Sequence, residues 1–204
     1  MSIFIIMPKL MSSFHSFVPK SSIPLLECWI AELDLDVRIS KPRRSKLGDF
    51  KVVKNRMVVT INNNLNTYSF LITIVHELAH AFVFREYGNS VPPHGNNWKA
   101  IYKSMMLNFL SPTFFPKDIL KVLSGHMVLP KASTYSDIEL VKVLKKYDDT
   151  ILLTISDIQV GELFKLSNGR SFIKGVRLRK RFRCIEEQTN KVYLFHPFSE
   201  VIRG

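Results

Sequence analysis

Two histidines and a glutamate lie within five consecutive residues, His76-Glu77-Leu78-Ala79-His80. Because an α-helix turns once in about 3.6 residues, side chains at positions i and i+4 lie on one face and can bind one metal ion. Glu77 stands beside the first histidine, where a carboxylate can accept a proton from a water that the metal activates. This is the H-E-x-x-H pattern typical of zinc hydrolases. The alternative is a core helix whose two histidines form hydrogen bonds and hold no metal.

The pattern requires a helix, and the surrounding sequence predicts one. Apolar residues recur with helical spacing at positions 71, 74, 75, 78, 79, 82 and 83. Since almost all of the segment 70–84 is apolar, we expect this helix to be buried on most of its surface. Burial of His76, Glu77 and His80 without partners would be costly, and a metal with its water is the simplest partner.

A catalytic zinc usually has three protein ligands, so a third ligand has to come from elsewhere. The metzincin extension would need a glycine and a histidine where the chain has Val83 and Glu86. A glutamate on the following helix is the other common solution, but no acidic residue occurs between Glu86 and Asp118. A third histidine does occur, His94, after two prolines that end the first helix. It is either the third ligand or a turn histidine in solvent.

The combined motif, His76 to His80 followed by His94-Gly95-x-x-Trp98, resembles that of the SprT-like metallopeptidase family. The segments 46–50 and 61–65 are similar to the strand region that precedes the metal helix in that family. The resemblance covers roughly residues 22–125.

The resemblance implies that His76, His80 and His94 bind one zinc ion and that Glu77 is the catalytic carboxylate. It implies a hydrolase that cleaves peptide bonds by means of a zinc-activated water, with Glu77 as general base. Many members of the family follow the peptidase domain with a four-cysteine zinc ribbon. This chain has only Cys184 in that region and no C-x-x-C pair, so we expect no second zinc.

The order of patterns predicts an α+β fold, with a zincin-like helical metallopeptidase core and a small sheet, followed by a small antiparallel β appendage. The expected helices are 25–33, 70–84, 97–109, 118–123 (closed by Gly125) and 137–147. The expected strands are 37–39, 51–53, 57–62, 158–160, 163–166, 171–174, 178–184 and 191–195. His126 is interpreted as a surface or capping histidine.

Four segments follow from these elements. Residues 1–21 form an N-terminal extension that is a candidate for disorder, and residues 22–126 form the SprT-like metallopeptidase domain. Residues 127–150 form a linker with a short helix, and residues 151–204 form a basic antiparallel β domain.

The chain carries a net charge of +12, which favours anionic partners and DNA above all. A basic loop at 41–46 and the last third of the chain, which has no acidic residue between Glu162 and Glu186, hold the candidate contacts. These are Arg43, Arg44, Lys46, Arg170, Lys174, Arg177, Arg179, Lys180, Arg181 and Arg183. The alternative for the loop is a solvated turn.

Aromatic residues alternate with these cations in the last third of the chain, at Phe164, Phe172, Phe182 and Tyr193. Basic strands with aromatic side chains can hold phosphates and stack bases. The alternative is a basic outer face over a phenylalanine core.

Two cysteines, Cys28 and Cys184, are too few for a disulfide scaffold and indicate no oxidising compartment. The apolar run at residues 3–7 is far shorter than the about 20 residues of a membrane span and lacks the flanks of a signal peptide. We therefore expect a cytoplasmic protein without membrane contact, with a monomer favoured.

Three functions fit these patterns. The first is a zinc metalloendopeptidase acting on nucleic-acid-associated or DNA-crosslinked proteins. The second is a nucleic-acid-associated binding protein whose zinc site is structural or vestigial, and the third is a peptidase of ordinary soluble proteins. The intact Glu77 favours an enzyme, since a structural site needs no general base.

Overall fold

The computed structural model describes residues 14–43, 46–133, 136–149 and 152–204, which divide into two compact units, Met1–Asp149 and Thr150–Gly204. Each unit has a hydrophobic core of its own. Helices and two sheets give the chain the expected α+β character. Most of the N-terminal extension and Arg44 of the basic loop lie outside the described residues.

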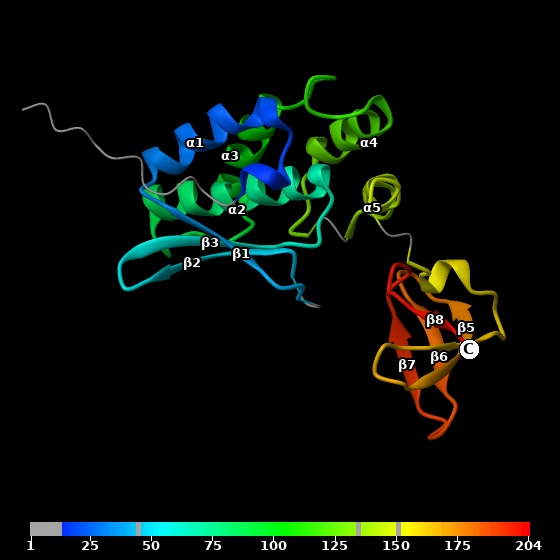
Figure 1. Ribbon diagram of the computed structural model, residues 1–204. Helices are drawn as coiled ribbons and strands as arrows, with labels where there is room; N and C mark the ends of the chain where they lie inside the picture. Colours follow the sequence, from blue (N-terminus) through cyan, green and yellow to red (C-terminus); the bar gives the residue numbers. More distant parts are fainter. Residues whose placement is uncertain (1–13, 44–45, 134–135, 150–151) are drawn as a thin grey trace, which may run out of the picture. The chain divides into compact units, whose positions relative to one another are not determined.

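In the first unit, α2 lies between a small sheet and the helices α1 and α3 (Figure 1). The helices are α1 (Ile23–Glu32), α2 (Thr67–Tyr87), α3 (Asn96–Leu107), α4 (Lys117–Val128) and α5 (Ile138–Lys145). Two short 3-10 turns, η1 (His15–Phe17) and η2 (Lys20–Ser22), precede them. Because packing covers α2 on both sides, its apolar composition is that of a core helix. Its length would also suit a membrane span, but 61% of its most apolar window is buried inside the unit.

The sheet of the first unit has the strand order β1-β3-β2, with β1 (Asp36–Ser40), β2 (Gly48–Val53) and β3 (Arg56–Asn62). The strand β1 runs parallel to β3, and β2 runs antiparallel to it. Lys54 and Asn55 both have positive φ values, 47° and 60°, as a two-residue hairpin turn requires. The strand β2 begins at Gly48, three residues before the expected start, and this extension reaches the metal helix.

The ends of α2 are set by side-chain and backbone caps. The Asn66 side chain accepts hydrogen bonds from the amides of Tyr68 and Ser69, which fixes the first turn. At the other end Gly88 has a φ of 58°, and its amide donates to the carbonyl of Phe84. Glycine adopts this left-handed conformation without strain, so the chain can leave the helix and turn back.

Two sequence expectations in α4 are wrong. The helix continues through Gly125 to Val128, because this glycine is not in the left-handed conformation that ends a helix. His126 is buried rather than at the surface, with 5% of its area exposed, and its Nδ1 lies 2.8 Å from the Asp137 carboxylate. Asp137 is the N-cap of α5 and accepts a hydrogen bond from the Leu140 amide.

The second unit contains a five-stranded antiparallel sheet with the order β7-β6-β5-β4-β8. Its elements are the 3-10 turn η4 (Ile155–Asp157), β4 (Leu163–Lys165), β5 (Ser171–Arg177), β6 (Phe182–Glu186), β7 (Val192–Phe195) and β8 (Ile202–Arg203). The expected strands 163–166 and 171–174 are joined by a tight turn at 167–170, with Gly169 at a φ of 82°. The expected strand 158–160 is wrong. The strand expected at 178–184 starts at Phe182, because residues 178–181 form a turn closed by a 2.7 Å hydrogen bond.

Candidate metal centre

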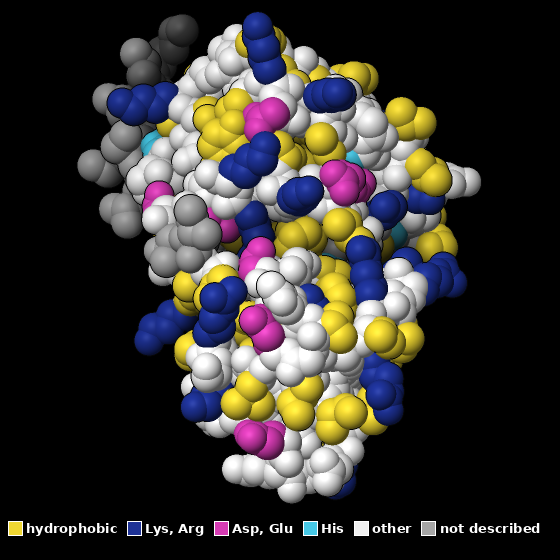
Figure 2. All heavy atoms as spheres, turned by 90° about the vertical axis from the view of Figure 1, so that its right-hand side faces the viewer, with side chains coloured by type: hydrophobic (Ala, Val, Ile, Leu, Met, Phe, Trp, Pro, Cys, Tyr) yellow, Lys and Arg dark blue, Asp and Glu magenta, His cyan; other side chains and the backbone are white. Residues whose placement is uncertain are grey.

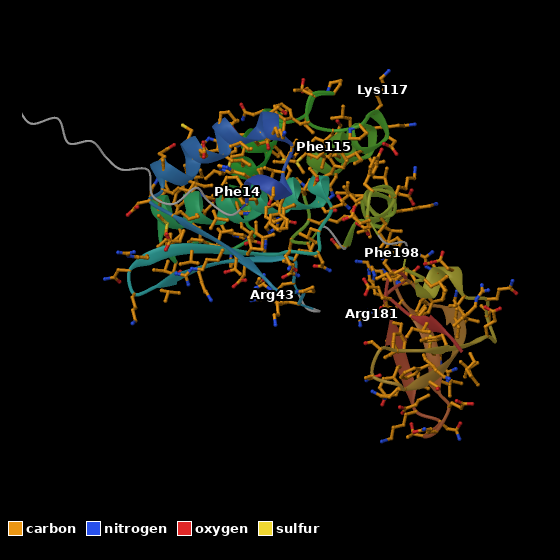
Figure 3. The ribbon with its side chains drawn as sticks, in the orientation of Figure 1. Phe14, Arg43, Phe115, Lys117, Arg181 and Phe198 are labelled. Carbon is orange, nitrogen blue, oxygen red and sulfur yellow. The ribbon has the colours of Figure 1, made fainter. Side chains whose placement is uncertain are left out.

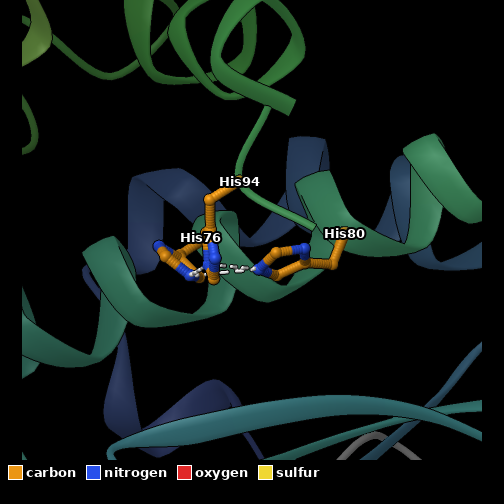
Figure 4. Close-up of side chains that lie close together, drawn as sticks. All are labelled: His76, His80 and His94. Atoms are coloured by element: carbon orange, nitrogen blue, oxygen red, sulfur yellow. Dashed lines mark hydrogen bonds between the residues drawn. The ribbon is translucent and has the colours of Figure 1, made fainter. Parts of the chain in front are cut away.

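Three imidazole rings converge beside α2 (Figure 4). His76 and His80 project from successive turns of α2, and His94 comes from the loop that returns from its end. The Nε2 atom of His80 lies 3.3 Å from that of His76 and 3.0 Å from that of His94, and the third separation is 3.4 Å. Two nitrogen ligands of a tetrahedral zinc, each at roughly 2.0–2.1 Å from it, are about 3.3 Å apart. The three histidines therefore match the donor type and spacing of a zinc site.

An aromatic wall formed by Trp98 and Tyr102 of α3 holds the three rings. The Trp98 indole is stacked on His80 with ring centroids 5.3 Å apart and lies 4.8 Å from His94 and 4.6 Å from His76. Its N–H donates to the carbonyl of His76 at 3.4 Å. Tyr102 stacks on Trp98 at 4.8 Å, and its ring centroid lies 5.4 Å from that of His76. Packing of α3 on α2 thus fixes the orientation of the histidines.

All three imidazoles are held in the neutral form. Burial, followed by the proximity of His94, lowers the pKa of His80 to about 4. Burial also lowers the pKa of His94, and it lowers that of His76 well below its ordinary value, with the neighbouring histidines acting in the same direction. Neutral imidazole is the form that binds a metal, so the site is ready for a cation at neutral pH.

Glu77 directly follows His76 on α2 and packs against Gly48 of β2, and only 7% of it is exposed. Its carboxylate accepts a hydrogen bond from the backbone amide of Phe50. This amide is available because of the hairpin register. The Asn62 amide donates to the Leu47 carbonyl, so Leu47 and every second residue after it form backbone hydrogen bonds with β3. Phe50 is one of the residues in between, and its N–H therefore points to the free edge of β2.

Gly48 gives β2 room to approach Glu77. A Cβ atom at this position would lie 2.8 Å from Cγ2 of Thr73 and 2.9 Å from Cγ of Glu77. Such separations are too short for any side chain, so only glycine lets the strand lie this close to the Glu77 carboxylate. Neither Gly48 nor the Phe50 amide was predicted as part of the site, since a backbone donor leaves no signal in residue type.

Replacement of Gly48 by Ala should displace Glu77 and slow hydrolysis by about tenfold or more, at a cost in stability of about 1–3 kcal/mol. The matched control is Gly125→Ala in α4, where an added Cβ meets nothing within 4 Å. Peptidase rates and melting temperatures of both variants test this prediction. Equal activity of the two variants would contradict the close packing of Gly48 on Glu77.

Burial and, after it, the charge of Asp49 raise the pKa of Glu77 to about 8. The Phe50 amide and the charges of Arg43 and Lys46 act in the opposite direction. This value describes the metal-free chain, and a bound divalent cation would lower the pKa again. Between pH 4.5 and about 8, the folded metal-free chain keeps a proton on Glu77 that the unfolded chain has lost.

The free energy of unfolding of the metal-free chain should therefore fall as pH rises through this window. Between pH 5.5 and 7.5, the free energy of unfolding of the wild-type chain should fall by about 2 kcal/mol more than that of the Glu77→Gln variant. Urea denaturation of both metal-free chains at the two pH values measures the difference. If both chains show the same pH dependence, Glu77 is not buried as described.

Two cations of the basic loop are used inside the first unit. The Arg43 guanidinium, labelled in Figure 3, donates to the Asp49 carboxylate, to Oδ1 of Asn62 at 2.7 Å and to the Thr60 carbonyl at 3.1 Å. Lys46 lies 3.2 Å from Asp49. These contacts hold the loop before β2 and place Asp49 where its charge acts on Glu77. Asn62, which is buried and joins this network, was not predicted from the sequence.

Two further candidate contacts are internal to the second unit. Arg170 is paired with Glu186 at 2.6 Å. Lys174 is 5% exposed, donates to the Ile158 carbonyl and lies 4.1 Å from the centroid of the Phe182 ring. The remaining five cations, Arg177, Arg179, Lys180, Arg181 and Arg183, are exposed. Phe164, Phe172 and Phe182 are buried, so the structure supports the alternative of a phenylalanine core under a basic face.

An H-E-x-x-H helix with a third histidine on a returning loop is an arrangement typical of zinc hydrolases. Residues 22–116 match the model of the SprT-like family, and this part of the chain belongs to that family. The chain is also similar to Protein SprT of Serratia proteamaculans (strain 568), with 48% identity over 42 residues. This match covers 20% of the chain and 24% of the relative, so it spans about a quarter of the relative's length. No solved structure matches the chain.

Proposed function

We propose that this chain is a zinc-dependent endopeptidase that cleaves proteins associated with or crosslinked to nucleic acid. The observation that carries the peptidase part is the convergence of the three Nε2 atoms of His76, His80 and His94 within 3.4 Å of one another, with a buried glutamate next to the first histidine. Membership of residues 22–116 in the SprT-like family supports it.

In this proposal His76, His80 and His94 hold the zinc ion. Bound zinc supplies Lewis acidity toward water and toward the scissile carbonyl. Glu77 accepts the proton of the attacking water and returns it to the leaving amine. The Phe50 amide and the space left by Gly48 keep the Glu77 carboxylate in place for both transfers.

The free edge of β2 offers a place for an extended substrate. Within the described residues, β2 pairs only with β3. The register turns the backbone groups of Gly48, Phe50 and Val52 toward the open edge, and the Phe50 amide is taken by Glu77. The other groups are free to pair with a peptide in the manner of an added strand, which would lay its backbone along the face of the site.

The charge of the chain supports a nucleic-acid-bound substrate, and its cysteine content supports a cytoplasmic location. A nucleic-acid-associated binding protein with a structural or vestigial zinc site is the second candidate. The burial of Glu77 favours the enzyme. A carboxylate with its pKa raised by burial lowers stability at neutral pH, and a purely structural site has no use for it.

The proposal is tested by incubation of the zinc-loaded chain with a DNA-binding protein, in the presence and absence of duplex DNA. We expect cleavage that depends on zinc and is faster when the substrate and the peptidase share a DNA molecule. Zinc binding without cleavage of any protein would favour the binding protein, and cleavage that ignores DNA would favour a general peptidase.

A further inference from the structure

Five exposed cations gather on one hairpin of the second unit. Arg177 ends β5, Arg179, Lys180 and Arg181 lie in the turn, and Arg183 lies in β6. The turn is closed by the hydrogen bond from the Leu178 amide to the Arg181 carbonyl. We call these five side chains the basic hairpin, and Arg181 is labelled in Figure 3.

No acidic side chain neutralises the basic hairpin within the described residues. The nearest acidic residues in sequence are Glu162 and Glu186, and Glu186 is already paired with Arg170 at 2.6 Å. None of the five cations forms an ion pair in the part of the chain that the structure describes. The hairpin therefore carries a local positive field that an anionic partner can neutralise.

The residue types favour phosphate as the anion. Four of the five cations are arginines, whose planar guanidinium groups bind phosphate oxygens in a bidentate manner. Five such groups at the end of one hairpin suit a polymer of phosphates better than a single small anion.

The phenylalanines that alternate with the cations are buried and not available for stacking on bases, and Tyr193 is half-buried against Arg170 and Phe172. Phe164 and Phe172 are fully buried and stack on each other with centroids 5.6 Å apart, and Phe182 lies beneath Lys174. Single-strand binding generally needs exposed aromatic platforms for the bases. The hairpin instead exposes aliphatic side chains, with Val176 58% and Leu178 46% exposed. Figure 2 shows Lys and Arg side chains bordering exposed apolar ones on one face of the molecule.

Arginines beside exposed aliphatic side chains are typical of proteins that grip a duplex from its minor groove. We propose that the basic hairpin binds the phosphate backbone of duplex nucleic acid, independently of sequence and in preference to single strands. This inference builds on the nucleic-acid part of the proposed function and assigns it to a surface outside the metal centre.

The test uses the full chain carrying Glu77→Gln, so that proteolysis does not interfere. Fluorescence anisotropy measures its binding to a labelled duplex and to a single strand of the same length at several salt concentrations. The hairpin variant carries Arg179→Ala, Lys180→Ala and Arg181→Ala. The control carries Lys117→Ala, Lys121→Ala and Lys142→Ala, which removes the same charge from exposed helix positions of the first unit.

We expect the parent chain to bind the duplex more tightly than the single strand. The hairpin variant should bind the duplex at least about tenfold more weakly, with a log–log salt slope shallower by about 2–3, since each phosphate contact contributes about 0.9 to it. The control should keep an affinity within about threefold of the parent's, because it leaves all five cations of the basic hairpin in place. Retained zinc content in both variants shows that the first unit is intact.

Equal losses in the two variants, an unchanged hairpin variant, or tighter binding of the single strand would each overturn the proposal. Vesicles with phosphatidylserine form a further arm, because a membrane surface also presents phosphates. Hairpin-dependent vesicle binding without duplex binding would replace nucleic acid by an anionic membrane. Duplex binding through the hairpin in a chain that cleaves no protein would leave this inference standing while the peptidase proposal fails.

Discussion

Replacement of Glu77 by Gln is expected to leave zinc bound and to slow peptide hydrolysis about 10²–10⁴-fold. The three imidazoles proposed to hold the metal are untouched, and the amide of Gln fills nearly the same volume beside Gly48 and Phe50. It cannot accept a proton at the pH of the reaction, so the general base is lost. Zinc content and the initial rate of cleavage, measured on the same preparation, separate the two effects.

The matched control for this variant is Glu86→Gln, which lies on the same helix but is exposed. It removes the same charge from α2 and should keep the wild-type rate. A Glu77→Gln chain with full activity would exclude Glu77 as the general base, whatever its metal content.

Replacement of His94 by Ala is expected to weaken zinc binding by more than about 100-fold and to abolish activity. Changes outside the ligand set typically cost 10–100-fold in metal affinity, and His94 supplies one of the three nitrogens directly. The loop between α2 and α3 should stay in place because Trp98 and Tyr102 remain buried against α2. Competition with a chromophoric chelator measures the change in affinity.

His196→Ala, in the second unit, is the control for the removal of an imidazole and should bind zinc like the wild-type chain. Unchanged zinc affinity after His94→Ala would mean that this histidine is a turn residue rather than a ligand.

Much of the metal centre could be predicted because its signals are local in the sequence. The i, i+4 spacing of His76 and His80 places both side chains on one face of a helix, and the apolar flanking residues strongly indicate that helix. The turn before His94 follows from adjacent prolines. The caps at Asn66 and Asp137 also depend on side chains that bond to nearby backbone amides, but the start of α2 was expected at residue 70, three residues after the observed start at Thr67.

The surroundings of Glu77 could not be predicted, because they depend on register and distance rather than on residue type. The early start of β2 brings Gly48 opposite Ile61 and against α2, and only that pairing leaves the Phe50 amide for the carboxylate. Arg43 was expected to face solvent or nucleic acid as part of a basic run. Instead its guanidinium donates hydrogen bonds to Asp49 and Asn62, which come within reach of it only in the folded chain.

In the second unit, the charge pattern alone could not show which basic side chains are buried and which are exposed. Lys174 lies on a strand with alternating burial, yet its ammonium group ends at the Ile158 carbonyl under the sheet. The two-residue strand β8 is too short to show periodicity and forms only because β4 offers it an edge. His126 was misplaced for a similar reason, because its partner Asp137 is supplied by the cap of the next helix.

Metal analysis of the purified chain, combined with removal and return of the metal, tests whether the three histidines hold a zinc ion that the activity requires. We expect one zinc ion per chain, loss of peptidase activity after chelation, and recovery of activity on addition of one equivalent of zinc. Peptidase activity that survives complete removal of metal, or zinc binding that persists after replacement of both His76 and His80, would contradict the account.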